Sequence, residues 1–317
     1  MHIPTFDDVK AARERIQPYI NRTPVLTSSY MNGLTGADLY FKCENFQKAG
    51  AFKVRGACNA VFGLSEEQAK KGVATHSSGN HALSLTYAAG RRGISAKVVM
   101  PRTAPEAKKA AVRGYGGTVV ECEPSITARE AGLREVIEET GADFVHPYND
   151  PRVIAGQATC ALEMVEEAGP FDIVIAPIGG GGMISGSCLT LSNIAPETKI
   201  YAAEPQAADD AARSLKAGEI ISYDAPQTVA DGLKVPLREY TWHFVSNHVT
   251  DILLASEEEI VSAMRLTWQR MKIVIEPSCA VPLATILKNP DIFAGKKVGV
   301  ILTGGNVDLD KLPWMSN

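Results

Sequence analysis

The feature that most constrains the fold is an alternation, along nearly the whole chain, of short β-branched runs with amphipathic stretches of helical length. This alternation is typical of βαβ units, in which helices connect the parallel strands of a sheet. Strands are predicted at 72–76, 96–100, 118–121, 172–177, 199–203 and 297–302. Helices are predicted at 80–92, 105–113, 127–139, 153–167, 183–193 and 257–271. The sequence therefore predicts an α/β fold with parallel or mixed sheets flanked by helices.

The 317 residues are enough for about two domains. Strand and helix units follow one another closely between residues 72 and 149, whereas the glycine-rich loops and the longest helices lie outside that span. We therefore predict a small, mobile domain at 72–149. It is inserted into a large domain formed by 1–71 and 150–317.

Charge and hydropathy exclude several classes of partner. The 32 Lys and Arg residues face 36 Asp and Glu residues, with a net charge of -4 and no long run of either sign. Nucleic acid and anionic membranes are therefore not expected as main partners. No apolar run approaches the roughly 18 residues of a spanning helix, and the N-terminus begins neither a signal sequence nor a transit peptide. We expect a cytoplasmic protein with a small-molecule substrate.

Three unusual loops follow predicted strands, at the strand ends where parallel α/β sheets bind ligands. Each begins directly after a strand, and the first two lead into a predicted helix. These loops are Ser77-Ser78-Gly79-Asn80-His81, Gly179-Gly180-Gly181-Gly182-Met183 and Thr303-Gly304-Gly305-Asn306.

The four consecutive glycines predict a phosphate site. Without side chains, backbone N–H groups can turn inward at a helix N-terminus and bind phosphate. A dinucleotide site is the rival interpretation, because the next strand, 199–203, ends at Glu204, where a ribose-binding acid would stand. The spacing disfavours it, since the pattern that starts at Gly180 places Ser185 where the third glycine belongs.

A lysine beside an aromatic residue lies in the segment Gly50-Ala51-Phe52-Lys53-Val54-Arg55-Gly56-Ala57. Considered alone, Lys53 would be interpreted as a charged residue on the protein surface. A phosphate loop, a helix start rich in Ser and Asn, and one lysine are together the parts needed to bind a phosphorylated aldehyde cofactor as a Schiff base.

These segments resemble the signature segments of the fold-type II pyridoxal-phosphate enzymes, in particular the branch of serine racemases and serine/threonine dehydratases. The resemblance runs from about Asp7 to Asp308 and extends to 23–29, 153–157 and 202–205. It implies that Lys53 binds pyridoxal 5'-phosphate covalently and that Phe52 packs on it. It implies further roles for Gly179, Gly180, Gly181, Gly182 and Met183 at the phosphate, for Asn80 at the ring oxygen and for Thr303 near the pyridine nitrogen.

The same resemblance assigns the substrate side of the site. Ser77, Asn80 and His81 would bind the substrate carboxylate, and Ser78 would face Lys53 across the cofactor ring. Tyr148 stands where animal racemases have an asparagine, and Ala51 where many relatives have a serine, which leaves the substrate open. Family members form homodimers, and we expect one here.

Two carboxylates follow the strand at 199–203. Glu204 and Asp210 could cap the next helix, but the resemblance implies that both bind a divalent cation together with the carbonyl of Ala208. Ligands that are all oxygen suit Mg, Mn or Ca.

We therefore expect an ammonia-lyase that eliminates water from a 3-hydroxy amino acid, giving a 2-oxo acid and ammonia. Serine racemase with a dehydratase side activity is the alternative, and a cofactor-binding sensor is a further one. The favoured substrate is 3-hydroxyaspartate, because the branch includes hydroxyaspartate dehydratases. Lys108 and Arg129, in the predicted small domain, are the candidate partners for the second carboxylate.

Overall fold

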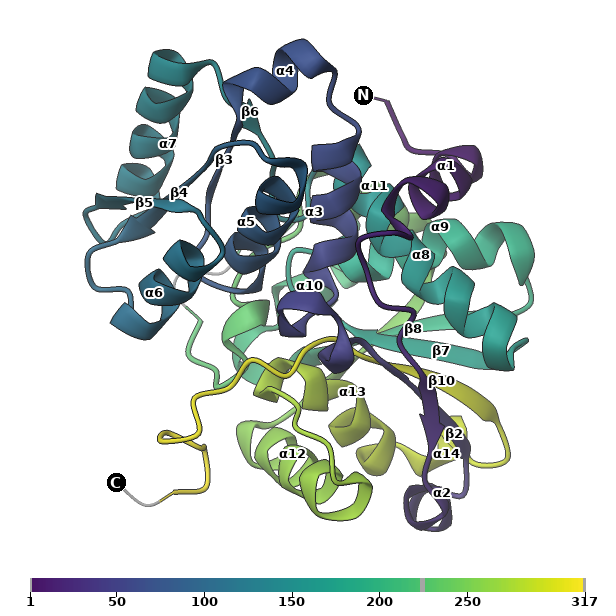
Figure 1. The fold of residues 1–317 in the computed structure, drawn as a ribbon. Helices are drawn as coiled ribbons and strands as arrows, with labels where there is room; N and C mark the ends of the chain where they lie inside the picture. Colours follow the sequence, from purple (N-terminus) through teal and green to yellow (C-terminus); the bar gives the residue numbers. More distant parts are fainter. Residues whose placement is uncertain (1, 223–225, 316–317) are drawn as a thin grey trace.

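The computed structural model describes residues 2–222 and 226–315, and its strands form two separate sheets (Figure 1). The larger sheet has the strand order β1-β2-β10-β7-β8-β9, in which only β1 runs antiparallel to its neighbour. The smaller sheet has the order β5-β4-β3-β6 and is entirely parallel. The strands are β1 (Val25–Thr27), β2 (Asp38–Cys43), β3 (Val73–His76), β4 (Ala96–Pro101), β5 (Thr118–Cys122), β6 (Asp143–Phe144), β7 (Ile173–Pro177), β8 (Lys199–Pro205), β9 (Val249–Ala255) and β10 (Lys297–Leu302).

Helices cover both faces of each sheet, as βαβ connections require. On the larger sheet, α12 and α13 pack on one face, while α8, α9 and α11 pack on the other. On the smaller sheet, α7 covers one face, and α5 and α6 cover the other. The helices are α1 (Phe6–Ile16), α2 (Ser29–Thr35), α3 (Lys53–Phe62), α4 (Glu66–Lys71), α5 (Asn80–Arg92), α6 (Glu106–Gly114), α7 (Ile126–Thr140), α8 (Pro151–Ala168), α9 (Gly182–Ile194), α10 (Asp210–Ala217), α11 (Glu239–His248), α12 (Glu257–Met271), α13 (Pro277–Lys288) and α14 (Pro290–Phe293).

The α/β prediction is confirmed, and the six predicted strands and six predicted helices are present with ends shifted by at most two residues. Several elements were not predicted from the sequence, among them the strands β2, β6 and β9. Strand β6 has only two residues, and β9 begins directly where α11 ends, without an intervening Gly or Pro. Strand β2 contains Lys42, which is completely buried and breaks the expected apolar pattern.

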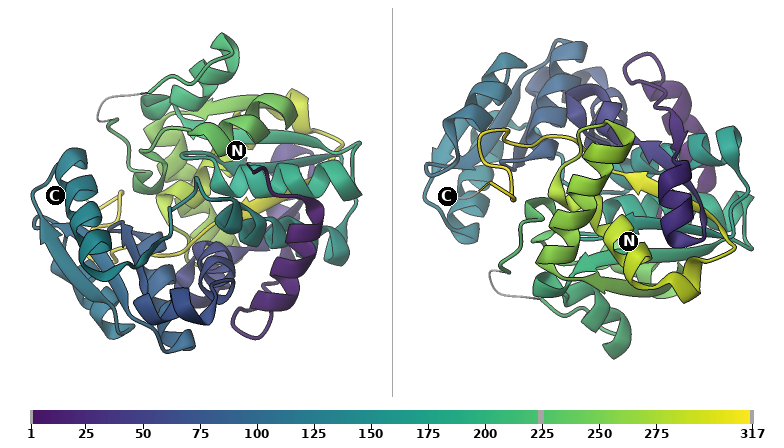
Figure 2. Two further views of the ribbon diagram at one scale, coloured as in Figure 1. Left: turned by 90° about the horizontal axis from the view of Figure 1, so that it is seen from above. Right: turned by 90° about the horizontal axis from the view of Figure 1, so that it is seen from below.

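The four strands of the smaller sheet all lie between residues 73 and 144, and Figure 2 shows this blue region beside the larger sheet. A hydrophobic cluster joins the two regions. It combines Val54 and Val61 of α3 with Leu85 of α5 and with Val153 of α8. The domain boundaries at 72 and 149 stay a prediction. Among the described residues, no helix has the length and apolar character needed to cross a bilayer.

The parallel pairing positions the site. Strands β10 and β7 are adjacent and parallel, so the loops that begin at Thr303 and Gly179 leave the sheet at the same edge. The chain before α3 reaches this edge too, because Ala51 forms a bridge with Gly304 and Phe52 N–H donates to the Thr303 carbonyl at 3.0 Å. Three segments that are far apart in the sequence therefore meet beside Lys53.

Candidate active site

Lys53 is the first residue of α3, and its side chain is partly buried. Its Nζ donates to the Pro147 carbonyl at 2.9 Å and lies 5.0 Å from the centre of the Phe52 ring. Burial lowers the pKa of the Lys53 amine to about 8, although the charge of Glu276 opposes this shift. A larger share of the amine is therefore neutral, and hence nucleophilic, at moderately basic pH than for an exposed lysine.

Helix α3 is anchored by ion pairs inside the protein. Arg55 is completely buried and donates to Glu44 through Nε at 2.7 Å and to Glu163 through Nη2 at 2.7 Å. Lys42 Nζ donates to the same Glu163 at 2.8 Å. Two buried cations thus balance two buried anions, and this cluster fixes α3 two residues after Lys53.

The glycine loop leads into α9, and each of its four glycines meets a neighbour so closely that a Cβ would not fit. A Cβ on Gly180 would lie 2.5 Å from the Tyr148 ring, and one on Gly179 would lie 2.7 Å from Leu233 Cα. Gly181 also has a φ of 84°, which disfavours any residue with a Cβ. The loop is therefore closely packed against its neighbours, and it leads into the N-terminus of a 13-residue helix, where an anion can bind.

The loop after β3 begins α5, and Asn80 is the first residue of that helix. Asn80 Nδ2 donates to Glu276 Oε1 at 2.9 Å and to Oε2 at 3.1 Å, while Asn306 Nδ2 donates to Asn80 Oδ1 at 2.9 Å. These bonds fix which way the Asn80 amide faces. Ser77 and Ser78 precede it and are partly buried.

The side chain of His81 is buried in the protein interior. Its side chain is 2% exposed, and Nε2 is 3.0 Å from the Val145 carbonyl oxygen. Burial and the charge of Lys53 lower the pKa of His81 to about 3, so the ring is neutral. The residue can therefore offer a substrate carboxylate its backbone N–H in the first turn of α5, whereas its ring faces Val145.

Thr303 follows β10 and is 3% exposed, and its carbonyl accepts a hydrogen bond from the Phe52 N–H.

Lys108 and Arg129, the predicted partners of the second carboxylate, differ in whether they form an ion pair. Lys108 Nζ pairs with Asp231 at 3.2 Å, which links α6 to the chain before α11. Arg129 forms no ion pair within the described chain. Burial lowers the pKa of His76, at the end of β3, and the positive charge of Arg129 lowers it further.

Glu204 caps helix α10, as one interpretation of the sequence suggested. Its carboxylate accepts from Ala211 N–H at 3.0 Å and from Ala212 N–H at 2.9 Å. Asp210 is 2% exposed, and its Oδ2 has no hydrogen-bond partner among the described residues. Burial raises the pKa of Glu204 to about 8 and that of Asp210 to about 6.

Within residues 2–222 and 226–315, no group of three or more His, Cys, Asp or Glu side chains is placed to hold a metal. Glu204, Asp210 and the carbonyl of Ala208 therefore stay predicted donors. The partnerless oxygen of Asp210 fits a cation that would complete its ligands with water.

Sequence reasoning missed Glu276, which reaches Asn80 and influences Lys53. The available signal was Pro277 directly after it, because proline is common at the first position of a helix and marks Glu276 as the preceding cap. Nothing in the sequence indicated that this helix start faces α5, 196 residues earlier.

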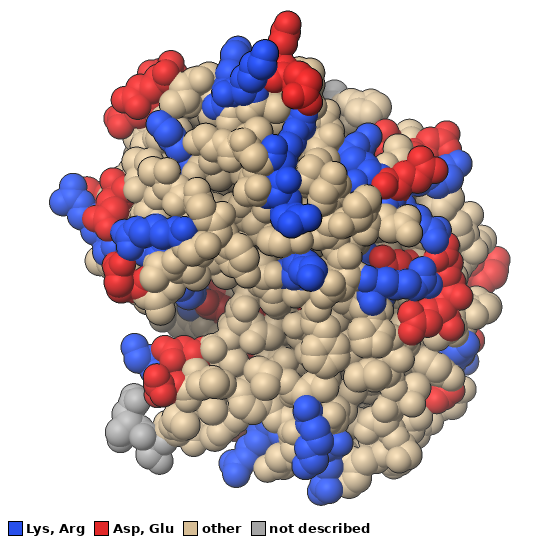
Figure 3. Space-filling model, viewed as in Figure 1, with Lys and Arg blue, Asp and Glu red and all other residues tan. Residues whose placement is uncertain are grey.

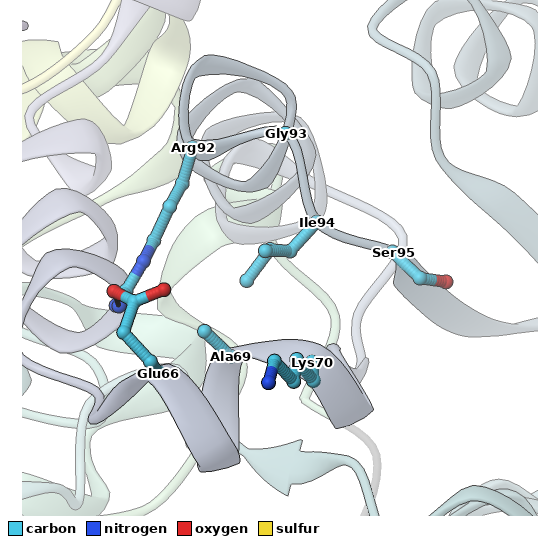
Figure 4. Close-up of a pocket in the computed structure, with 7 residues that line it drawn as sticks. All are labelled: Glu66, Ala69, Lys70, Arg92, Gly93, Ile94 and Ser95. Atoms are coloured by element: carbon cyan, nitrogen blue, oxygen red, sulfur yellow. Dashed lines mark hydrogen bonds and ion pairs between the residues drawn. The ribbon is translucent and has the colours of Figure 1, made fainter.

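One surface cavity of about 380 Å³ lies between α4 and the end of α5, and it contains none of the predicted site residues (Figure 4). Instead, Figure 3 shows a hollow on the left of the molecule, where the region of the smaller sheet meets the region of α12 and α13.

The sequence pattern of one protein family, described as "Pyridoxal-phosphate dependent enzyme", matches residues 16–304. The chain belongs to this family. It is therefore a pyridoxal-phosphate-dependent enzyme. The predicted family and pyridoxal phosphate are confirmed, whereas the divalent cation stays a prediction.

Two named relatives cover nearly the whole chain. The beta-hydroxyaspartate dehydratase of Paracoccus denitrificans is 69% identical over 314 residues, which are 99% of this chain and 100% of the relative. The serine racemase of Dictyostelium discoideum is 47% identical over 99% of this chain and 98% of its own length. Its crystal structure superposes with a TM-score of 0.93 at 48% identity, covering 96% of this chain and 99% of that chain. The structure of maize serine racemase gives a TM-score of 0.96 at 44% identity, covering 98% and 95%.

Proposed function

We propose that this enzyme eliminates water from 3-hydroxyaspartate and releases oxaloacetate and ammonia. The observation that carries this proposal is the partly buried Lys53 amine, which donates to the Pro147 carbonyl. The next residue, Tyr148, packs against the glycine loop. The 69% identity to an enzyme named beta-hydroxyaspartate dehydratase supports the choice of substrate.

The residues present fit the cofactor. When bound, pyridoxal phosphate supplies an electron-withdrawing ring that acidifies the substrate α-proton. The backbone N–H groups of Gly179 to Met183 would bind its phosphate, Asn80 would hydrogen-bond its ring oxygen, and the hydroxyl of Thr303 would be the group near its pyridine nitrogen. A neutral hydroxyl does not keep that nitrogen protonated, which favours expulsion of a leaving group over long-lived carbanion chemistry.

Lys53 is the general base. Its Nζ takes the proton from the substrate Cα, and the pKa of about 8 suits this role near neutral pH. The hydroxyl on Cβ then leaves as hydroxide. The N–H groups in the first turn of α5, with Ser77 and Asn80, bind the substrate α-carboxylate at the positive end of the helix.

The second carboxylate of hydroxyaspartate needs a cation, because a buried carboxylate without a partner is costly. Arg129 serves this role, since its guanidinium has no ion pair within the described chain and lies near His76. Lys108 is less suited, because it already pairs with Asp231. We propose that the 72–149 region closes over the substrate and brings Arg129 to it.

Glu204, the carbonyl of Ala208 and Asp210 bind a divalent cation in this proposal, with Mg, Mn and Ca as the candidates. Two buried carboxylates with raised pKa values and one partnerless oxygen support it. The homodimer and the cytoplasmic location stay predictions.

The experiment begins with reconstitution of the purified chain. With pyridoxal phosphate it should show an absorbance band at about 410–420 nm that borohydride removes, and Lys53→Ala should show no such band.

Steady-state kinetics on serine, threonine and the hydroxyaspartate stereoisomers then identify the substrate. Arg129→Ala should lower kcat/KM for hydroxyaspartate by roughly 10²-fold and leave that for serine nearly unchanged. A wild-type preference for serine would overturn the substrate.

Serine racemase with a dehydratase side activity is the second candidate. It is supported by the 47% identity to the Dictyostelium discoideum racemase and by Ser78, which lies two residues before α5 and which the family resemblance assigns to the face opposite Lys53. Chiral analysis of serine after incubation with the enzyme separates the two functions.

A further inference from the structure

The segment 145–149, which connects β6 to α8, is hydrogen-bonded at both ends. The carbonyl of its first residue, Val145, accepts from the Thr75 hydroxyl at 3.0 Å. The side chain of its last residue, Asn149, accepts from the Tyr240 N–H through Oδ1 at 3.0 Å. Strand β3 of the smaller sheet therefore fixes one end of the segment, and helix α11 fixes the other.

His146 closes a turn inside this segment. Its Nδ1 accepts from the N–H groups of Tyr148 and Asn149 at 3.2 and 2.9 Å, so that nitrogen carries no proton. Burial lowers the pKa of His146 to about 3, and the ring is therefore neutral at the pH of any ordinary assay. The rings of Phe144 and Tyr148 pack edge-on against it, with centroids 5.6 and 4.6 Å away, and hold it in this orientation.

The peptide unit between Pro147 and Tyr148 connects the imidazole to Lys53. In a trans peptide the C=O and the N–H lie in one plane and point in opposite directions. The N–H of this unit donates to His146 Nδ1, and its C=O accepts from Lys53 Nζ at 2.9 Å. The ring that binds one edge of the unit therefore sets where the opposite edge meets the lysine.

The residues on both sides of this peptide unit have little freedom to move. Proline fixes its own φ, which restricts the chain before the unit. The Tyr148 side chain after it is confined by the glycine loop, since a Cβ on Gly180 or Gly182 would lie 2.5 or 2.9 Å from it. Rotation of the peptide plane is the motion that remains, and the bond to His146 opposes it.

We propose that His146 is a positioning residue that, through the peptide unit after Pro147, fixes Lys53 Nζ for removal of the substrate Cα proton. This inference rests on the proposed function and deepens it. Once substrate has displaced the lysine from the cofactor, the neutral amine has two N–H groups and one lone pair. A carbonyl that binds one N–H limits rotation about the Cε–Nζ bond, and the lone pair takes the proton. The same carbonyl stabilises the ammonium group that results.

The charged and titratable groups around the lysine decide what a test can measure. The charge of Glu276 raises the pKa of the amine. His81 is neutral, with a pKa of about 3. His146 is neutral as well, because burial and the positive charges of His76 and Arg238 lower its pKa. Removing the His146 ring therefore removes no charge, and a shift in the pKa of the lysine reports the lost hydrogen bond.

The first test measures covalent attachment of pyridoxal phosphate to cofactor-free enzyme, by stopped-flow absorbance against pH. His146→Leu keeps an apolar side chain among the rings and removes the acceptor. The carbonyl then favours the ammonium form less, so the pH of half-maximal rate should fall by about half a unit or more. His146→Asn should keep the wild-type profile, because an Asn side-chain oxygen accepts from the N–H two residues on. An unchanged profile in His146→Leu, or equal shifts in both variants, would overturn the proposal.

The second test uses holoenzyme and 3-hydroxyaspartate with hydrogen or deuterium at Cα. In His146→Leu, kcat should fall about tenfold and KM should change by less than about threefold. The isotope effect on kcat should be at least as large as in the wild type, because proton removal is the step that is slowed. His146→Asn should recover most of the loss. A lower kcat with a smaller isotope effect would overturn the role of His146.

A matched control and a stability measurement complete the design. His248→Leu removes an exposed histidine at the end of α11, whose ring stacks on Phe244 at 6.3 Å, and it should change neither readout. A lower Tm in His146→Leu with a wild-type attachment profile would show a merely structural role and overturn the proposal. If holoenzyme dehydrates no hydroxy amino acid, the proposed function fails, and the attachment profiles still decide whether His146 positions the lysine.

Discussion

Asn80 and Glu276 are joined by two hydrogen bonds, from Nδ2 of the amide to both carboxylate oxygens, at 2.9 and 3.1 Å. The pair connects the first turn of α5 to the residue before α13, and so connects the loops of the two sheets. Glu276 is also the acid whose charge opposes the lowering of the pKa of Lys53.

This relationship predicts how cofactor attachment depends on pH. Only the neutral Lys53 amine attacks the aldehyde, so in cofactor-free enzyme the rate of covalent attachment should rise with pH and reach half its maximum near a pH of about 8. Glu276→Gln removes the charge that raises this pKa, so the profile should move to lower pH. Stopped-flow absorbance measures the rates, and Glu106→Gln is a control at an exposed carboxylate. An unchanged or upward-shifted profile in Glu276→Gln would contradict the coupling.

The glycine loop predicts a difference between substitutions at two glycines that both have a positive φ. Gly181 and Gly93 both have positive φ, 84° and 72°, but a Cβ on Gly93 meets nothing within 4 Å. Gly93→Ala should lose about 1–2 kcal/mol of stability from backbone strain alone. Gly181→Ala should lose more and should also bind pyridoxal phosphate at least roughly tenfold more weakly. Urea unfolding and equilibrium cofactor titration measure the two effects, and equal cofactor affinity would argue against the phosphate site.

Ser78 should distinguish racemisation from elimination. Inversion at Cα needs a second acid–base group opposite Lys53, whereas elimination needs only the base. Ser78→Ala should therefore lower serine racemisation by about 10²-fold or more and largely spare elimination from substrates deprotonated by Lys53. Chiral chromatography and oxo-acid assays on the same samples measure both rates. Parallel losses in both reactions would mean that Ser78 does not have this separate role.

The carboxylates near α10 predict a response to chelation. A cation bound only by the folded protein stabilises it by about 2.7 kcal/mol at a concentration a hundred times its Kd. EDTA should lower both Tm and activity, and magnesium should restore both. In Glu204→Gln, chelation should have little further effect. If EDTA leaves the Tm and the activity of the wild type unchanged, Glu204 only caps helix α10 by accepting from the N–H groups of Ala211 and Ala212.

The buried ion pairs behind Lys53 predict a large loss of stability. Arg55→Ala leaves Glu44 and Glu163 without their main partner, and this should cost about 3–5 kcal/mol. Arg270→Ala, which removes an exposed guanidinium stacked on Tyr30, should change stability by about 0.5 kcal/mol or less. Denaturant unfolding compares the two variants, and similar small losses in both would show that the buried cluster is dispensable.

The fold was predictable where the pattern is local. Strand β10 and helix α5 were found because apolar periodicity, flanking glycines and helix caps lie within a few residues of each element. The loops after β3, β7 and β10 were found for the same reason, since position after a strand is itself a local property. The pyridoxal-phosphate family and the dehydratase function agree with the relatives found.

The sequence by itself thus determined the elements, the loops that carry the chemistry and the lysine at their centre. Only the tertiary structure showed that Glu276 binds Asn80, 196 residues away, and that Arg55 joins Glu163, 108 residues away. It also turned the ring of His81 toward Val145. Such contacts depend on how two sheets and their helices pack, and no short-range pattern records which buried charge finds which partner, because each partner is selected by the geometry of the whole core.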